Sequence, residues 1–385
     1  MQNNTTKLPN LKEIEQMLWR ELQETYAKAL EDILINIDNQ LAESRDKKRF
    51  RMVDRRKTSI SSLYGEIQFK RYYYRDREKE EHVFLLDRCL EFEGEGGFSP
   101  LVEEAAIQFA VKAPSYRKAE NLLESLLGYS VMSHETIRQH LLKVIQIPKD
   151  RESLERPVLF VEVDGLYIKN QGKGKRKKGR EKKIAAVHQG WIKNGKRVKL
   201  KGKRHYVHEE GSGPFWEGFE TFLMDTFDYD PTNHFLIING DGANWITACR
   251  DHFNNNRAFF TLDRFHVAKT IRSLFRGHRR YRYIRKALAD YNPEKLLMEL
   301  NSAVGTLEDE RKEDDLEAFI KQLEQYPEAL TDYRKWLKEK KIDISGLRPM
   351  GSAEGTMSVF AKRLKNGRSW VDKGCSAMMT AMVAY

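Results

Sequence analysis

Apolar positions recur at helical spacing near the start of the chain. Between residues 11 and 37 they return every three or four residues, which predicts an amphipathic helix of several turns. Asn10 followed by Glu13 has the form of a capping box, so the helix is expected to begin directly after Asn10. A strongly charged stretch at 45–57 follows this helix and interrupts the apolar pattern.

The pattern then changes from helical spacing to alternation. Residues 59–74 alternate around Gly65, which predicts a β-hairpin, and the short apolar run 83–86 predicts a third strand. Residues 91–100 are rich in glycine and acidic side chains, which is typical of a linker.

Two helices in close succession are predicted next. The leucine-rich stretch 115–128 stops at Gly128, a residue type favoured at helix ends, and Ser133 can cap a second helix. This pair predicts a helix-turn-helix whose second helix would contact DNA through its outward polar side chains, Thr136, Arg138 and Gln139. An ordinary helical hairpin is the alternative.

The second half of the chain first reads as strands and then as strands alternating with helices. Apolar runs predict strands over 158–165, 183–192, 234–241 and 257–263, and the basic stretch after residue 192 is expected to form one more strand. From about 267 to 345 the pattern is charged and helical, and one more helix is predicted near Glu354. Together these elements predict the α/β class, with a mixed sheet covered on both faces.

Positive charge is concentrated in one part of the chain. The formal net charge is +11, but 169–204 alone holds 16 Lys and Arg against one acid, Glu181, and therefore carries +15. The remaining chain has 52 basic and 56 acidic residues, which gives −4. A polycation of this kind most simply binds phosphates, and nucleic acid fits it better than a membrane surface.

Three widely spaced cysteines, Cys89, Cys249 and Cys375, imply no disulfide framework. The first ten residues are polar and lack the apolar stretch of a signal peptide. No apolar run approaches the ~18 residues of a membrane span. A reduced, cytoplasmic, soluble protein is expected.

Aspartates stand at the predicted ends of three strands: Asp164, Asp241 and Asp263. Glu354 shares the predicted inward stripe of the late helix with Met357, and burying an unpaired carboxylate there is costly unless a cation receives it. Carboxylates that converge from separate strands suit Mg²⁺ or Mn²⁺, and paired ions can activate a nucleophile for phosphodiester displacement.

Each of these acids also has a structural interpretation. Asp164 can be a turn residue beside Gly165, Asp241 and Asp263 can cap the helices that follow them, and Glu354 can simply favour the helix dipole. Their joint occurrence with a basic segment and a helix-turn-helix pattern favours the metal site.

The stretches VEVDG, INGDGANWI, LDRFHV and GSAEG, in that order, resemble the DDE transposases of bacterial insertion sequences. The similar branch is the one akin to eukaryotic Mutator elements, and the closest group has long been catalogued as an uncharacterised protein family. The resemblance runs from the hairpin near Tyr64 to Trp370. It implies a ribonuclease H-like catalytic fold with an all-α insertion at about 267–345, and two divalent ions.

Carried over by this resemblance, the metal-binding triad falls on Asp164, Asp241 and Glu354. The family's Cys-or-Asp, two residues, then His pattern falls on Asp263 and His266, with Cys249 and His252 as a rival pair of equal spacing. The implied role of His266 is contact with DNA or the scissile phosphate rather than zinc binding.

The expected organisation is a helix and hairpin region (1–97), a helix-turn-helix domain (98–150) and a catalytic domain (157–385). The expected partners are double-stranded DNA, at terminal repeats and target, and a second copy of the chain. The expected activity is Mg²⁺- or Mn²⁺-dependent strand cleavage and transfer. A catalytically inactive DNA-binding repressor and a hydrolase of RNA–DNA hybrids are the alternatives.

The loop 169–183 holds nine Lys and Arg and joins the first two catalytic strands. It is expected to contact DNA phosphates rather than to be merely solvated, through Lys173, Lys175, Arg176, Lys177, Lys178, Arg180, Lys182 and Lys183. The sequence stops at Tyr385 in an apolar stretch, where the resembled family often continues, which is the pattern of a shortened copy.

Overall fold

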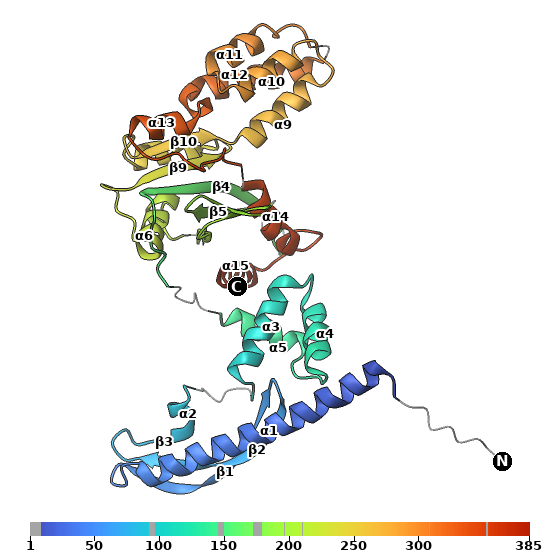
Figure 1. Cartoon of the computed structure of the whole chain (residues 1–385), viewed down its shortest axis with the longest axis vertical. Helices are drawn as coiled ribbons and strands as arrows, with labels where there is room; N and C mark the ends of the chain where they lie inside the picture. Colours follow the sequence, from blue (N-terminus) through green and yellow to red (C-terminus); the bar gives the residue numbers. More distant parts are fainter. Residues whose placement is uncertain are drawn as a thin grey trace, which may run out of the picture. The chain divides into compact units, whose positions relative to one another are not determined.

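The structure is a computed structural model of the whole chain, shown in Figure 1. It describes residues 9–91, 97–144, 150–171, 179–195, 197–209, 211–307, 309–351 and 353–385. The chain divides into two compact units, residues 1–144 and 145–384, and each unit is described by itself. The predicted division of the first unit at residue 97 stays a prediction.

The first unit opens with the predicted helix, α1 (Leu11–Ser44). Its capping box is confirmed: the Glu13 backbone N–H donates to the Asn10 side chain at 3.0 Å, and the Asn10 N–H donates to the Glu13 carboxylate at 2.9 Å. The second half of α1 packs on a three-stranded antiparallel sheet that contains the predicted hairpin. These strands are β1 (Phe50–Ser62), β2 (Gly65–Asp76) and β3 (Glu81–Val83).

The hairpin is longer than the alternation predicted, because most of the charged stretch 45–57 belongs to β1. The side chains of residues 51–57 are exposed, so this part of β1 has no alternation of apolar and polar residues from which a strand could be predicted. The predicted third strand ends earlier than 86, since α2 (Leu85–Cys89) begins within that run.

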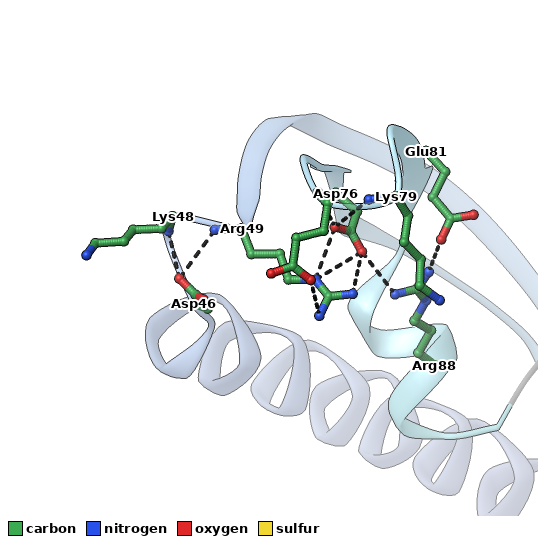
Figure 2. A network of polar contacts seen from close by, with 8 residues as sticks. Asp46, Lys48, Arg49, Asp76, Lys79, Glu81 and Arg88 are labelled. Carbon is green, nitrogen blue, oxygen red and sulfur yellow. Dashed lines mark hydrogen bonds and ion pairs between the residues drawn. The ribbon is translucent and has the colours of Figure 1, made fainter.

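A cluster of ion pairs closes the end of this hairpin (Figure 2). The Asp76 carboxylate is buried and accepts hydrogen bonds from the Arg49 guanidinium at 2.9 and 3.1 Å. Arg88 of α2 lies 3.7 Å from the same carboxylate and donates to Glu81 at 2.6 Å. The Arg49 hydrogen bonds lower the pKa of Asp76 to about 2, so this acid stays ionised within a structural cluster of ion pairs.

Three helices complete the first unit: α3 (Pro100–Lys112), α4 (Tyr116–Leu127) and α5 (His134–Leu142). The predicted pair corresponds to α4 and α5, and both local signals are confirmed. Gly128 has a φ of +78° at the end of α4, and the Ser133 hydroxyl caps α5 by accepting from the Thr136 N–H. Helix α3 packs against both and was not predicted.

The second unit is built on a mixed five-stranded sheet with the order β10-β9-β4-β5-β8. Strands β4, β5 and β8 form an antiparallel meander, while β9 and β10 lie parallel to β4 on its other side. The bounds are β4 (Val158–Ile168), β5 (Arg180–His188), β8 (Arg204–Val207), β9 (Phe235–Gly240) and β10 (Ala258–Leu262). A separate hairpin, β6 (Trp191–Asn194) and β7 (Arg197–Leu200), lies between β5 and β8 in the chain. The predicted α/β class and mixed sheet are confirmed.

Both faces of the sheet are covered, as alternation along its strands requires. Leu159, Val161 and Val163 of β4 belong to the main core with α6 (Phe215–Phe227). Val158 and Phe160 face a second core with α13 (Tyr333–Glu339). The predicted helix after Asp241 is in fact two short helices, α7 (Asn244–Thr247) and α8 (Cys249–His252).

The predicted helical stretch begins directly after β10, slightly earlier than 267. It comprises α9 (Arg264–Phe275), α10 (Tyr281–Ala289), α11 (Pro293–Asn301), α12 (Glu310–Gln325), the 3₁₀ turn η2 (Pro327–Leu330) and α13. Two helices follow, α14 (Ala353–Leu364) and α15 (Asp372–Ala384). Among the described residues, none of the helices has the length and apolar character needed to cross a membrane.

Candidate active site

Parallel pairing sets a polar row across the middle of the sheet. Glu162 of β4 is in register with Asn239 of β9, and Asn239 with Thr261 of β10. All three side chains are buried, at 0–5% exposure, and the Asn239 amide donates to the Glu162 carboxylate at 2.7 Å. The parallel pairing of β4 with β9 ends at this row, and that of β9 with β10 ends one residue later.

Each predicted aspartate lies two residues beyond a member of this row: Asp164, Asp241 and Asp263. Asp241 and Asp263 directly follow the last residues of β9 and β10, as predicted. The prediction that Asp164 ends its strand is wrong, since β4 continues to Ile168 through its pairing with β5. Its pairing with β9 nevertheless stops at Glu162, so Asp164 still lies past the end of the parallel part of the sheet.

The charges of these acids act on one another. Burial raises the pKa of the Asp164 carboxyl, and the negative charges of Asp241 and Asp263 raise it further. The Gly165 N–H, which donates to Asp164 at 2.7 Å, and the neighbouring His266 lower it without reversing the shift. The site therefore holds excess negative charge, which a bound cation would relieve.

His266 lies beside this cluster in the first turn of α9. Its Nδ1 is 2.9 Å from Asp263 Oδ2, and this hydrogen bond, together with the charges of Asp263, Asp164 and Asp241, raises the pKa of the imidazole. The other Asp263 oxygen accepts from the Phe265 N–H at 2.9 Å and caps α9. Asp263 thus caps α9 and also binds the His266 imidazole, so the predicted pair of Asp263 and His266 is in direct contact.

The glycines that flank Asp241 are required by close packing. A Cβ on Gly240 would lie 2.5 Å from the Ile246 side chain. Gly242 has a φ of +90°, and a Cβ there would lie 2.8 Å from the Gln322 amide nitrogen. Gln322 belongs to α12 and donates to the Asp241 backbone carbonyl at 3.1 Å, so the helical insertion is anchored on the loop that carries this acid.

Glu354 is not on the inward stripe of its helix, so that prediction is wrong. Its side chain is exposed in the first turn of α14, while Ala353, Thr356, Met357 and Phe360 are buried. Helix α14 packs on β4, the strand that carries Asp164. Within the described residues, no three His, Cys, Asp or Glu side chains lie close enough to hold a metal ion as they stand.

Glu162 is a site-building residue that the sequence analysis missed. One carboxylate oxygen accepts from Asn239, and the other accepts from the Gly351 N–H at 3.0 Å, just before α14. Lys203, whose positive charge lies near Glu162, donates to the Thr356 hydroxyl of α14 at 2.8 Å. Burial lowers the pKa of Lys203, although Glu162 opposes this effect. The sheet therefore holds the chain on both sides of Glu354.

The predicted DNA-binding loop falls mostly outside the described residues, which is the case for Lys173, Lys175, Arg176, Lys177 and Lys178. The remaining three begin β5 instead of lying in a loop. Lys182 is only 5% exposed, and DNA contact by Arg180, Lys182 and Lys183 stays a prediction. The Lys183 ammonium lies 5.0 Å from the Trp245 ring centroid, and Arg180 lies 3.7 Å from Asp372.

The start of the loop between β4 and β5 is fastened by the segment between α14 and α15. The Trp370 N–H donates to the Lys169 carbonyl at 2.9 Å, and the Gln171 N–H donates to the Trp370 carbonyl at 2.8 Å. The buried Trp370 indole donates to the Leu364 carbonyl at 2.8 Å. Trp370 is thus a structural residue.

The rival pair does not join the acid cluster. Cys249 is 1% exposed in the main core, where burial raises the pKa of its thiol to about 12. His252 is 2.9 Å from the Glu220 carboxylate.

On α5, Thr136, Arg138 and Gln139 are partly or fully exposed, and Arg138 pairs with Glu135 at 2.6 Å. DNA contact by α5 stays a prediction.

Comparison with known proteins assigns the chain to a family. Residues 4–385 match the uncharacterised protein family UPF0236. The chain belongs to the UPF0236 family. A UPF0236 protein in the vanSb 3′ region of Streptococcus gallolyticus is 27% identical, over 97% of this chain and 83% of that protein. A UPF0236 protein of Caldanaerobacter subterraneus is 25% identical, over 98% of this chain and 77% of its own length.

Proposed function

We propose that this UPF0236 chain is a transposase that cleaves DNA strands at the ends of an insertion sequence and joins them to target DNA. The proposal comprises a ribonuclease H-like catalytic core, a helix-turn-helix in the first unit, and a divalent cation, Mg²⁺ or Mn²⁺. The observation that carries it is the electrostatically coupled cluster of Asp164, Asp241 and Asp263 at one edge of the sheet.

The sheet supports the proposed core. A meander of three antiparallel strands, followed by two strands parallel to the first, is the arrangement expected of a ribonuclease H-like fold. Acids past the ends of the central parallel strands occupy the position where open α/β sheets commonly build their sites.

The donor set fits a hard cation. Asp164 and Asp241 offer carboxylate oxygens, and their mutual repulsion favours a positive ion between them. When bound, paired divalent ions would activate the attacking water or 3′-hydroxyl and stabilise the leaving oxygen. Glu354 would complete the set from the first turn of α14.

Asp263 and His266 have a different role from the metal-binding acids. Asp263 holds the Nδ1 side of the imidazole, and the surrounding acids favour its protonated form. The protonated ring can offer its Nε2–H to a phosphate oxygen. Asp263 therefore acts as a positioning residue for His266.

The names of relatives add independent support. One UPF0236 protein of Caldanaerobacter subterraneus, 23% identical over 98% of this chain, has a name that joins eleven designations from one strain. Several designations for one protein are what an element that has spread within a genome would produce. A repressor encoded once per genome would not require them.

The test uses end-containing duplex DNA and Mn²⁺ with the wild-type chain and Asp241→Asn. Nicking by the wild type is expected, and Asp241→Asn should abolish nicking while binding of the same duplex is retained. Persistent nicking by Asp241→Asn would contradict the assignment of this residue.

A catalytically inactive DNA-binding protein is the second candidate. The exposed position of Glu354 favours it, because cleavage requires this carboxylate to reach Asp164 and Asp241. Binding without nicking in both Mg²⁺ and Mn²⁺ would support this candidate over the transposase.

A further inference from the structure

A second basic segment lies outside the predicted DNA-binding loop. Residues 264–289 contain nine Lys and Arg and no Asp or Glu. They form α9, the turn after it, and α10, which the charge analysis of the sequence did not single out.

Seven of these cations are exposed, and they follow the outward faces of the two helices. On α9 the spacing of three and four residues places them on one face, and those on α10 follow the same rule. They are Lys269 and Arg272 on α9, Arg276 directly after its end, Arg279 in the turn, and Arg282, Arg285 and Lys286 on α10. We name this set the α9–α10 basic face.

Among the described residues, none of the seven cations of this basic face forms an ion pair with an acid. The ion pairs of the segment join His266 to Asp263 and Arg280 to Glu299, each at 2.9 Å, and neither His266 nor Arg280 is in the set. Exposed aromatic rings border the face: Phe265 is 45% and Tyr283 is 49% exposed. The Arg282 guanidinium lies 5.5 Å from the Tyr283 ring centroid.

The face starts at the acid cluster. Asp263 caps α9, and His266 occupies its first turn, so the row of cations leads outward from the candidate active site. Twelve residues of α9 span about 18 Å, which corresponds to roughly five base-pair steps along the axis of a DNA duplex.

A membrane surface fits these helices less well than DNA. Membrane-bound amphipathic helices insert an apolar face, but the apolar faces of α9 and α10 are already buried within the second unit. The buried residues include Ile271, Leu274, Phe275, Ile284 and Leu288. What remains outward is charge with scattered aromatic rings, as in proteins that follow a phosphate backbone.

We infer that the α9–α10 basic face binds the phosphate backbone of the DNA that enters the active site. The inference rests on the proposed function for the identity of the ligand as DNA. Binding by this face does not require cleavage, so the two can fail separately.

The test measures binding of a 30-base-pair duplex to the full chain carrying Asp241→Asn, over a range of salt concentrations. In one variant, Arg272, Arg276, Arg282 and Arg285 are each changed to Gln. The matched control changes four exposed cations of α12 and α13 to Gln: Arg311, Lys312, Lys335 and Lys338. Unchanged circular dichroism and melting temperature confirm that both variants fold.

The α9–α10 variant is expected to bind at least about tenfold more weakly, and its log–log salt slope should fall by about 3–4. The control should stay within about threefold of the parent. Equal weakening in both variants, or no weakening in the α9–α10 variant, would overturn the inference. The inference would also be overturned if the α9–α10 variant lost binding to vesicles of 30% phosphatidylserine while its DNA binding was unchanged. If the wild-type chain, with Asp241 intact, does not nick the duplex but the salt slopes are as expected, the result counts against the proposed function and leaves this inference standing.

Discussion

Two acidic clusters in this protein meet opposite electrostatic surroundings. In the first unit, Asp76 is buried against Arg49 and Arg88, and its pKa falls to about 2 (Figure 2). In the second unit, burial raises the pKa of Asp164, and the negative charges of Asp241 and Asp263 raise it further. The negative charge of Asp76 is therefore paired with arginines, whereas Asp164 has other acids as charged neighbours.

The difference separates acids that hold the fold together from acids that are available to a ligand. A paired carboxylate contributes stability and has little left to offer a cation, whereas clustered carboxylates reduce stability unless something positive binds. Glu162 sharpens the contrast, because it lies two residues before Asp164 in the same strand yet is engaged by Asn239 and Gly351.

The largest expected effect is on catalysis by Asp164→Asn. Nicking of end-containing duplex in Mn²⁺ should fall by about 10³-fold, which is the loss of several kcal/mol of charge stabilisation. The free energy of unfolding, measured by urea titration, should stay the same or rise, because repulsion with Asp241 is relieved. A large loss of stability would show that Asp164 is a structural acid like Asp76.

Glu162→Gln should have the reverse profile. Removal of a buried charge that faces Lys203 and accepts from Gly351 should lower the free energy of unfolding by about 2–3 kcal/mol. Urea titration measures this loss, with Asp164→Asn as the control on the same strand. Equal stability of the two variants would remove the distinction between them.

The smallest effect is a difference in pH dependence. The pKa of Asp76 is depressed from 3.8 to about 2, so its stabilisation is present above pH 3.8 and is lost as pH falls through about 2. Asp76→Asn should therefore be less stable than the wild type at pH 5, and the gap should close in acid. Asp164 has a raised pKa, so Asp164→Asn should gain stability relative to the wild type as pH rises through that value. Thermal melts between pH 2 and 7 measure both, and gaps of the same sign would contradict the comparison.

Local signals in the sequence predicted the elements well. The Asn10 capping box, the Gly128 helix end and the Ser133 cap each depend on a few neighbouring residues, and each is present. The strand ends at Asp241 and Asp263 were predictable for the same reason.

Features that depend on distant partners were not predictable. Lys182 is a buried strand residue, which its charged side chain did not suggest. Burial depends on what packs against a residue in the fold rather than on its neighbours in the sequence. The spacing from Met357 suggested that Glu354 faces inward, but the contacts of α14 with β4 decide its orientation. The role of Glu162 depends on Gly351, which lies 189 residues later in the chain.

That separation has a consequence for how the protein is made. At ribosomal rates of about 5–20 residues per second, roughly 10 to 40 seconds pass between synthesis of Glu162 and of its partner Gly351. During this interval the nascent sheet contains a carboxylate whose hydrogen-bond donor at Gly351 has not yet been translated. The packing of α14 on β4 should therefore form late, after the main core between Leu159 and Leu330 has been translated.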